Sequence, residues 1–240
     1  MANLTQLRML EGLSGFIPVD KPAGLAFSTV VKTVKRKFNL VKVGHGGSLD
    51  AMASGLLVLL VGDANAFASD VMGADRSYVG TMTLGLRTNT GDVHGATVGA
   101  TEAAEIRLDD DRLTAALRAC RGDVFQTEPR FCSVRREGRA DYEIADTGAH
   151  EPFLAHVYRF EVEPGAGSAN FRLDATKSLL VRALVADFGE ALGCGACLAS
   201  LRRTKVGALD VADAVPFDRL LETEMADFAS LVQPVLKLKG

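Results

Sequence analysis

The sequence has no hydrophobic run long enough to cross a membrane. Its longest apolar stretch, residues 56–61, has six residues, whereas a membrane helix needs about 20. The first eight residues also lack the basic-then-apolar order of a secretory signal. These absences predict a cytoplasmic protein with no membrane anchor.

Cysteine is scarce, with four residues in a chain of 240. Cys194 and Cys197 form a single Cys-x-x-Cys pair near an expected helix end, but a structural zinc site of this type needs a second pair. We therefore interpret the cysteines as small packing residues in a reduced, intracellular chain. No metal site is expected.

An excess of positive charge is also missing, because the net charge is −3. This value argues against indiscriminate binding to nucleic acid. Basic residues nonetheless form three clusters: Lys32, Lys35, Arg36 and Lys37; Arg130, Arg135, Arg136 and Arg139; and Arg202, Arg203 and Lys205. One such cluster is typical of a solvated helix face, but three beside the motifs described below favour RNA binding.

The pattern of apolar residues predicts interspersed helices and strands. Helices are expected at 27–38 with Ser28 as cap, 64–72, 109–120, 179–192 and 220–231, and strands at 56–61, 78–84, 153–163 and 170–175. Residues 164–168 read as a hairpin loop. Because no regular alternation of strand and helix appears, the prediction is an α+β fold with a mixed or mostly antiparallel sheet.

Asp50 follows a glycine-rich loop and precedes the apolar run at 56–61. A buried carboxylate is costly unless a cation or hydrogen-bond donors accompany it, so this aspartate is kept either for structure or for chemistry. A phosphate-binding loop would need a following Gly-Lys-Ser/Thr, and a nucleophilic serine would need Gly-x-Ser-x-Gly; neither is present. His45 and Asp50 lack neighbours that would complete a metal site. A tight turn capped by the aspartate remains an alternative.

Residues 44–55, from Gly44-His45 through Leu49-Asp50 to Gly55, resemble the catalytic motif of the TruB-type tRNA pseudouridine synthases. Further blocks follow that family's order: Asp20-Lys21-Pro22 with Gly24; Arg76-Ser77-Tyr78; Thr88, Thr90, Asp92 and Gly95; residues 132–145; and residues 177–204 with Lys177, Arg182 and Leu201-Arg202-Arg203-Thr204. The resemblance covers roughly residues 15 to 215.

The resemblance implies a pseudouridine synthase fold, in which a central sheet with flanking helices surrounds an active-site cleft. It implies isomerisation of uridine 55 in the T-arm of tRNA, with no cofactor and no obligatory protein partner. We expect a monomer in which residues 1–240 form one catalytic domain. Residues 216–240 would form a last helix and tail, and the C-terminal RNA-binding PUA domain of many relatives would be absent.

The family resemblance also suggests roles for individual residues. Asp50 would be the catalytic carboxylate, Arg182 its salt-bridge partner, and Tyr78 the aromatic residue that stacks on the flipped base and reaches C5. From the residues alone, Arg182 could instead lie on a solvated helix face, and Tyr78 could be an ordinary core aromatic. The expected substrate-binding residues are His45, which fills space left by extruded nucleotides or is a simple turn histidine; Asp20 and Lys21 at the cleft rim; and Leu180, Lys177 and Arg202.

The match departs from the family pattern at a few positions. Leu180 replaces a pocket-lining tyrosine, and Gly46-Gly47-Ser48 and Asp50-Ala51-Met52 replace the usual Thr-Gly-Ala and Asp-Pro-Leu. The missing proline leaves the backbone after Asp50 less restricted. Two alternatives therefore stay open: a tRNA-remodelling protein without catalysis, and a guide-dependent rRNA pseudouridine synthase.

Overall fold

The computed structural model describes residues 10, 12–102, 109–127 and 151–235, with the backbone of 135–136 and 139–140. The chain divides into two compact units. Unit 1 is made of residues 1–76 and 202–240, and unit 2 of residues 77–201. None of the helices in the described ranges has the length and apolar character that a membrane crossing requires.

Unit 1 is built on a mixed sheet. Its strands are β1 (Gly15–Lys21), β2 (Val43–His45), β3 (Ser54–Val61), β13 (Leu209–Asp210), β14 (Val215–Pro216) and the end of β12 (Ala196–Val206). The order is β14-β1-β3-β12, with β2 paired to β3 and β13 to β12. β3 runs antiparallel to β1 and parallel to β12, where Arg203 lies opposite Gly55.

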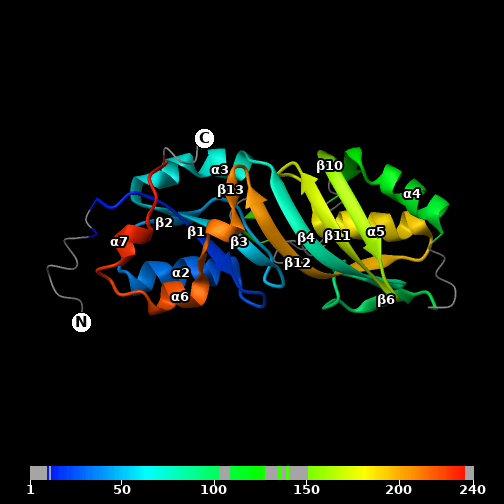
Figure 1. Ribbon diagram of the computed structural model, residues 1–240, viewed down its shortest axis with the longest axis horizontal. Helices are drawn as coiled ribbons and strands as arrows, with labels where there is room; N and C mark the ends of the chain where they lie inside the picture. Colours follow the sequence, from blue (N-terminus) through cyan, green and yellow to red (C-terminus); the bar gives the residue numbers. More distant parts are fainter. Residues whose placement is uncertain are drawn as a thin grey trace. The chain divides into compact units, whose positions relative to one another are not determined.

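β3 is apolar throughout because both of its faces are covered. Leu57, Leu59 and Val61 pack on one side with α2 (Phe27–Lys37), α6 (Phe217–Glu222) and α7 (Phe228–Leu231). Leu56, Val58 and Leu60 pack on the other side with η1 (Gly62–Phe67) and α3 (Ala68–Gly73). Figure 1 shows α3 on one side of these strands and α2 with α6 on the other. A strand buried on two faces carries a continuous apolar run instead of an alternating one.

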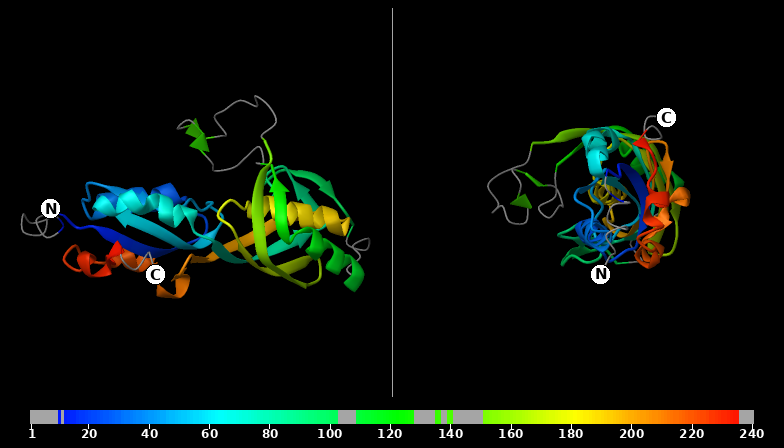
Figure 2. Two further views of the ribbon diagram at one scale, coloured as in Figure 1. Left: turned by 90° about the horizontal axis from the view of Figure 1, so that it is seen from above. Right: turned by 90° about the vertical axis from the view of Figure 1, so that its left-hand side faces the viewer.

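The last described segment of the chain returns to the first strand. β14 runs parallel to β1, and Phe16 and Gln233 exchange main-chain hydrogen bonds of 2.9 and 2.8 Å. Figure 2 shows the final helices, in orange and red, beside β1, in dark blue. Unit 1 therefore needs both of its chain segments for its core.

Within the described residues, unit 2 has its own sheet and two helices, of 10 and 12 residues. Its elements are β4 (Arg76–Leu84), β5 (Leu86–Thr88), β6 (Thr97–Ala100), α4 (Asp110–Ala119), β7 (Gly122–Gln126), β8 (Arg135–Arg136), β9 (Arg139–Ala140), β10 (Phe153–Pro164), β11 (Ser168–Ala175), α5 (Val181–Leu192) and the start of β12. The strand order is β12-β4-β11-β10-β7, with separate pairs β5-β6 and β8-β9.

Helix α5 contacts the sheet of unit 2 through an aromatic pair. The rings of Phe188 and Phe160 meet edge to face, with centroids 5.4 Å apart. The helix ends at Gly193, whose φ of 82° is the left-handed conformation that glycine adopts readily. Helix α4 begins at Asp109, whose carboxylate accepts a hydrogen bond from the N–H of Arg112.

The predicted α+β architecture with a mixed sheet and flanking helices is confirmed. Several local predictions were wrong, and the helix expected at 64–72 is a 3-10 helix, η1, followed by the short helix α3. Ser28 lies inside α2, which begins after Ala26 without a side-chain cap. The expected helix at 220–231 is two short helices, α6 and α7, because the chain leaves helical geometry at Thr223.

The described cysteines Cys120, Cys194 and Cys197 are free and buried, which fits packing residues. Cys197 belongs to β12 and not to a helix end. Cys132 lies outside the described residues.

Candidate active site

Asp50 lies on the loop that links β2 to β3. The N–H of Gly46 donates to the carbonyl of Val58 (2.8 Å), and the N–H of Ala53 donates to the carbonyl of Asp50 (3.1 Å). These bonds close the loop at both ends. Leu49 is buried and Asp50 is half-buried, so the loop is anchored by an apolar side chain next to a carboxylate that solvent can reach.

Arg203 holds the same loop from β12. Its side chain is 1% exposed, and its guanidinium donates to the carbonyls of Leu56 (2.8 Å), Ser48 (2.9 Å) and Gly47 (3.4 Å). In the sequence, Arg203 belongs to a basic cluster that favours RNA binding. Its burial shows instead that this cation is part of the interior of unit 1.

Lys21 is the second buried cation of unit 1. Its ammonium donates to the carbonyls of Pro22 (2.8 Å), Leu25 (2.7 Å) and Ala51 (3.4 Å), and its side chain is completely buried. Burial lowers the pKa of Lys21 from 10.5 to about 8, while nearby Asp50 opposes the fall and Arg203 adds to it. Lys21 was expected to shape and charge the rim of a cleft; its ammonium is held inside unit 1 by carbonyls of its own turn and of Ala51.

Asp20 and Arg202 form a bidentate ion pair. The two guanidinium nitrogens Nη1 and Nη2 donate to the two carboxylate oxygens at 2.9 and 2.7 Å. The side chains are 26% and 38% exposed respectively. Both residues therefore remain within reach of solvent, as expected for residues near a binding surface.

His45 is fixed at the start of the loop. Its Nδ1 accepts a hydrogen bond from the N–H of Gly47 (3.2 Å), which places the ring proton of the neutral form on Nε2. The ring also meets Phe27 edge to face, with centroids 4.8 Å apart. His45 therefore stabilises its own turn, and this does not conflict with the expected contact between His45 and RNA.

Tyr78 and Arg182 belong to unit 2. Tyr78 is 7% exposed in β4. Arg182 is the second residue of α5 and donates from Nη1 to the carbonyl of Thr90 (3.0 Å) and to Oδ2 of Asp92 (3.3 Å). Asp92 is itself buried. The alternative of a solvated arginine is wrong, because the Arg182 side chain is only 13% exposed.

Leu180 is fixed by its main chain. Its N–H donates to Oε1 of Gln126 (2.8 Å), and its carbonyl accepts from Nε2 of the same residue (3.2 Å). The Leu180 side chain is half-buried, and Lys177 is exposed. The buried Gln126 therefore fixes the position of the backbone shortly before Arg182.

Asp50, Lys21 and His45 are thus in unit 1, whereas Tyr78, Arg182 and Leu180 are in unit 2. The pairing of Asp50 with Arg182 joins two units and stays a prediction. Of the basic clusters, Arg130 lies outside the described residues, and Arg135, Arg136 and Arg139 are described by their backbone alone.

Two sequence profiles match the chain and cover both units. The profile of the TruB family pseudouridylate synthase (N-terminal domain) matches residues 35–173, and that of the tRNA pseudouridylate synthase B C-terminal domain matches residues 182–237. The chain belongs to the TruB family of pseudouridylate synthases.

Individual TruB relatives agree with this assignment. The tRNA pseudouridine synthase B of Aromatoleum aromaticum is 36% identical over 240 residues, covering 98% of this chain and 76% of the relative. The protein of the same name from Burkholderia pseudomallei is 37% identical over 214 residues, covering 88% and 70%. The resemblance in the sequence motifs is confirmed by these matches.

A solved structure shares the TruB-type fold. A chain in the crystal structure of a Cbf5–Nop10–Gar1 complex superposes with a TM-score of 0.73 at 25% identity. The match covers 97% of this chain but 63% of that chain. The fold is therefore that of a pseudouridine synthase.

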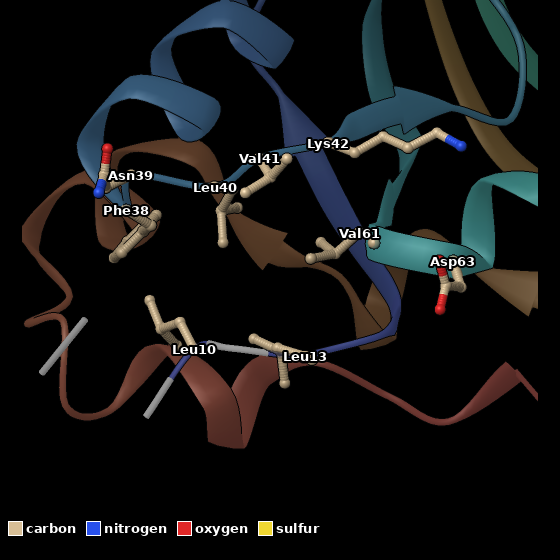
Figure 3. A pocket seen from close by; sticks show the side chains of 11 residues that line it. Leu10, Leu13, Phe38, Asn39, Leu40, Val41, Lys42, Val61 and Asp63 are labelled. Atoms are coloured by element: carbon tan, nitrogen blue, oxygen red, sulfur yellow. The ribbon is translucent and has the colours of Figure 1, made fainter. Parts of the chain in front are cut away.

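A pocket of about 500 Å³ in unit 1 is not lined by Asp50, His45 or Lys21. It is lined mainly by apolar side chains, including Leu10, Leu13, Phe38 and Leu40, with Lys42 and Asp63 at its edge (Figure 3). Within the residues that the structure describes, no group of three His, Cys, Asp or Glu side chains could hold a metal ion.

Four residues that shape the site were not expected there from the sequence: Thr90, Asp92, Arg203 and Gln126. Thr90 and Asp92 lie in one of the motif blocks that carry the resemblance, which is the signal that could have found them. Arg203 carried a weaker signal, because it follows the apolar start of β12 but stands among Arg202, Thr204 and Lys205. Gln126 carried no signal that we recognise.

Proposed function

We propose that this protein converts uridine to pseudouridine at position 55 in the T-arm of tRNA, with Asp50 as the catalytic carboxylate. The observation that supports it most directly is the half-buried Asp50 on a loop to which two buried cations donate hydrogen bonds. Membership of the TruB family supplies the class of reaction.

The reaction needs no redox step. The bond between N1 and ribose C1′ breaks, the uracil turns over, and C5 bonds to C1′; C5 loses its proton and N1 gains one. Asp50 acts either by attacking C1′ or by assisting a glycal-forming path, and both need an ionised carboxylate. No cofactor is required for this sequence of steps.

The other predicted residues would assist this reaction by binding the carboxylate, the base or the RNA. Arg182 would stabilise the charge on Asp50, and Tyr78 would stack on the flipped base with its hydroxyl directed to C5. Leu180 would give the base an apolar contact, and His45 would occupy space vacated by extruded nucleotides. Lys177 and Arg202, both reachable by solvent, would contact phosphates.

The proposal includes the organisation of the protein. Residues 1–240 would act together as one catalytic domain, since Asp50 and Arg182 come from different units. We expect a monomer in the cytoplasm that acts on tRNA without an obligatory protein partner. Light scattering of the purified protein, alone and with tRNA, tests the oligomeric state.

A tritium-release assay on tRNA transcript labelled at uridine C5 tests the proposed activity. Wild-type protein should release tritium, and Asp50→Asn should release none while still binding tRNA. Asp75→Asn, which changes an exposed acid of the same unit, should behave as wild type. Replacing uridine 55 by cytidine in the transcript should abolish release.

Each alternative gives a different result in that assay. Binding without any release by the wild type would indicate a remodelling protein, and release only after addition of a guide RNA would indicate a guide-dependent enzyme. Turnover by Asp50→Asn would refute the role of Asp50.

A further inference from the structure

Arg203 is a buried cation whose hydrogen bonds lie on both sides of Asp50 along the chain. Two acceptors, the carbonyls of Gly47 and Ser48, precede the aspartate, and the third, of Leu56, follows it. A single guanidinium therefore closes the loop over residues 47–56. The planar group has N–H donors in fixed directions, so it sets the relative positions of its acceptors.

The glycines of the loop allow this approach. A Cβ at Gly55 would lie 2.2 Å from the carbonyl oxygen of Arg203, and the φ of Gly55 is +100°. At Gly47, where φ is +131°, a Cβ would lie 2.7 Å from Nη2 of Arg76. Glycine is therefore required at these two positions, because the Asp50 loop packs closely against Arg203 and Arg76 there. This explains why the loop is rich in glycine.

A second tie comes from Lys21. Its ammonium bonds to the carbonyl of Ala51, the residue immediately after Asp50. Arg203 and Lys21 also repel each other enough to contribute to the lowered pKa of Lys21. Burying two like charges this close together is unfavourable for stability, so an apolar interior would be the simpler solution for folding alone.

We propose that Arg203 is a positioning residue, which holds the Asp50 loop in its reactive shape through the carbonyls of Gly47, Ser48 and Leu56. Because its side chain is 1% exposed, Arg203 acts through the loop and does not touch RNA. This inference rests on the proposed role of Asp50.

The test compares Arg203→Lys and Arg203→Met with wild type. Lysine keeps the charge but cannot reach all three carbonyls, whereas methionine removes both charge and donors. Arg121→Lys is the matched control, since Arg121 also donates to a main-chain carbonyl, that of Phe160 (2.9 Å from Nε), in unit 2. Hydrogen exchange of the amides at 46–56 and steady-state kinetics on tRNA are measured for each variant.

For Arg203→Lys we expect exchange in the loop at least about 10-fold faster, with amides of β10 and β11 unchanged. The kcat should fall about 10- to 100-fold because the carboxylate is displaced, while KM for tRNA stays within about three-fold. Arg203→Met should show a larger loss of kcat than Arg203→Lys, and Arg121→Lys should match wild type. If Arg203→Met does not fold, Arg203→Lys alone carries the test.

Unchanged loop exchange in Arg203→Lys would overturn the inference, as would a raised KM with unchanged kcat, which would assign Arg203 to RNA binding. The two proposals fail separately. Unchanged loop exchange with an active wild type removes the role of Arg203 and leaves the function. Faster loop exchange with a wild type inactive on tRNA removes the function and leaves Arg203 as a structural tie.

Discussion

Arg182 donates a hydrogen bond to Oδ2 of Asp92 at 3.3 Å, and both side chains are almost completely buried, with exposures of 13% and 10%. The other oxygen of Asp92 accepts from the hydroxyl of Thr90 (3.1 Å) and from the N–H of His94 (2.9 Å). The carboxylate is thus held by its own turn, and it fixes the direction of the arginine at the start of α5. In the proposed function, Arg182 would pair with Asp50 from this anchored position.

Asp92→Asn should lower kcat for pseudouridine formation by about 10- to 100-fold, because the uncharged amide no longer orients Arg182 by charge. Binding of tRNA should change by less than about three-fold, since Asp92 is buried and phosphate contacts come from exposed groups. We also expect a loss of about 1–3 kcal/mol in the free energy of unfolding, the cost of a buried arginine without its ion pair. Tritium release and urea denaturation measure the two effects.

Asp123→Asn provides the control for Asp92→Asn. Asp123 pairs with His156 on the surface of the same unit, with side chains 66% and 43% exposed. This variant should keep wild-type kcat and stability. An Asp92→Asn enzyme with full kcat would show that Arg182 is oriented without this carboxylate.

The ion pair of Asp20 and Arg202 allows structure and RNA binding to be separated. A double-mutant cycle of Asp20→Asn and Arg202→Gln should give a coupling of about 1 kcal/mol in unfolding, since the pair is bidentate but partly solvated. If Arg202 contacts a phosphate, Arg202→Gln should weaken tRNA binding and reduce the salt slope by about one. Asp20→Asn keeps the cation and should not weaken binding.

Filter binding at several salt concentrations measures these RNA effects. Equal weakening by both variants would mean that the pair supports RNA binding only through its structure. No weakening by Arg202→Gln would remove Arg202 from the binding surface.

Much of the fold follows from local patterns in the sequence. The apolar run at 56–61 predicted β3 because a strand packed on both faces contains little except apolar residues. The helix at 179–192 was predicted by its apolar face, and the structure has it at Val181–Leu192. The Pro164–Ser168 loop also forms a hairpin, in which the N–H of Gly165 donates to the carbonyl of Ser168 (2.7 Å).

Around Asp50, the predictions that failed concern charged residues whose surroundings come from distant parts of the chain. Nothing local distinguishes Arg202, half-exposed, from Arg203, which is buried. The difference arises because β12 lies beside β3 in parallel and alternate side chains point to opposite faces. Lys21 likewise depends on the carbonyl of Ala51, 30 residues away, a contact that no sequence period reveals.

Lys21 should make stability depend on pH in an unusual direction. Its pKa is about 8 in the folded protein and 10.5 ordinarily, so between these values the unfolded chain holds a proton that the folded protein has released. Stability contributed by this group therefore rises with pH in that window. Relative to Lys21→Met, the wild type should gain about 2 kcal/mol in unfolding free energy from pH 7 to pH 10.

Urea denaturation of wild type and Lys21→Met across that range measures the gain. Lys32→Met, which removes an exposed lysine of α2, should show a constant difference from wild type over the same range. A constant difference for Lys21→Met too would mean that the folded protein keeps Lys21 protonated up to its ordinary pKa.

Gly55→Ala should be the most destabilising single-carbon addition among the glycines of the Asp50 loop. The new Cβ would lie 2.2 Å from the carbonyl oxygen and 2.8 Å from the main-chain nitrogen of Arg203, at a φ of +100°. Backbone atoms of a paired strand cannot move aside as a flexible side chain can. We expect Gly55→Ala to lower the free energy of unfolding by at least about 3 kcal/mol, from backbone strain and overpacking together.

Gly167→Ala separates these two contributions. Gly167 also has a positive φ, of +70°, but a Cβ there would meet no atom within 4 Å. Gly167→Ala should therefore lower the free energy of unfolding by only about 1 kcal/mol, which is the cost of the left-handed conformation alone. Denaturation midpoints of the two variants give the comparison, and similar losses at both positions would mean that β12 does not press against the strand that follows Asp50.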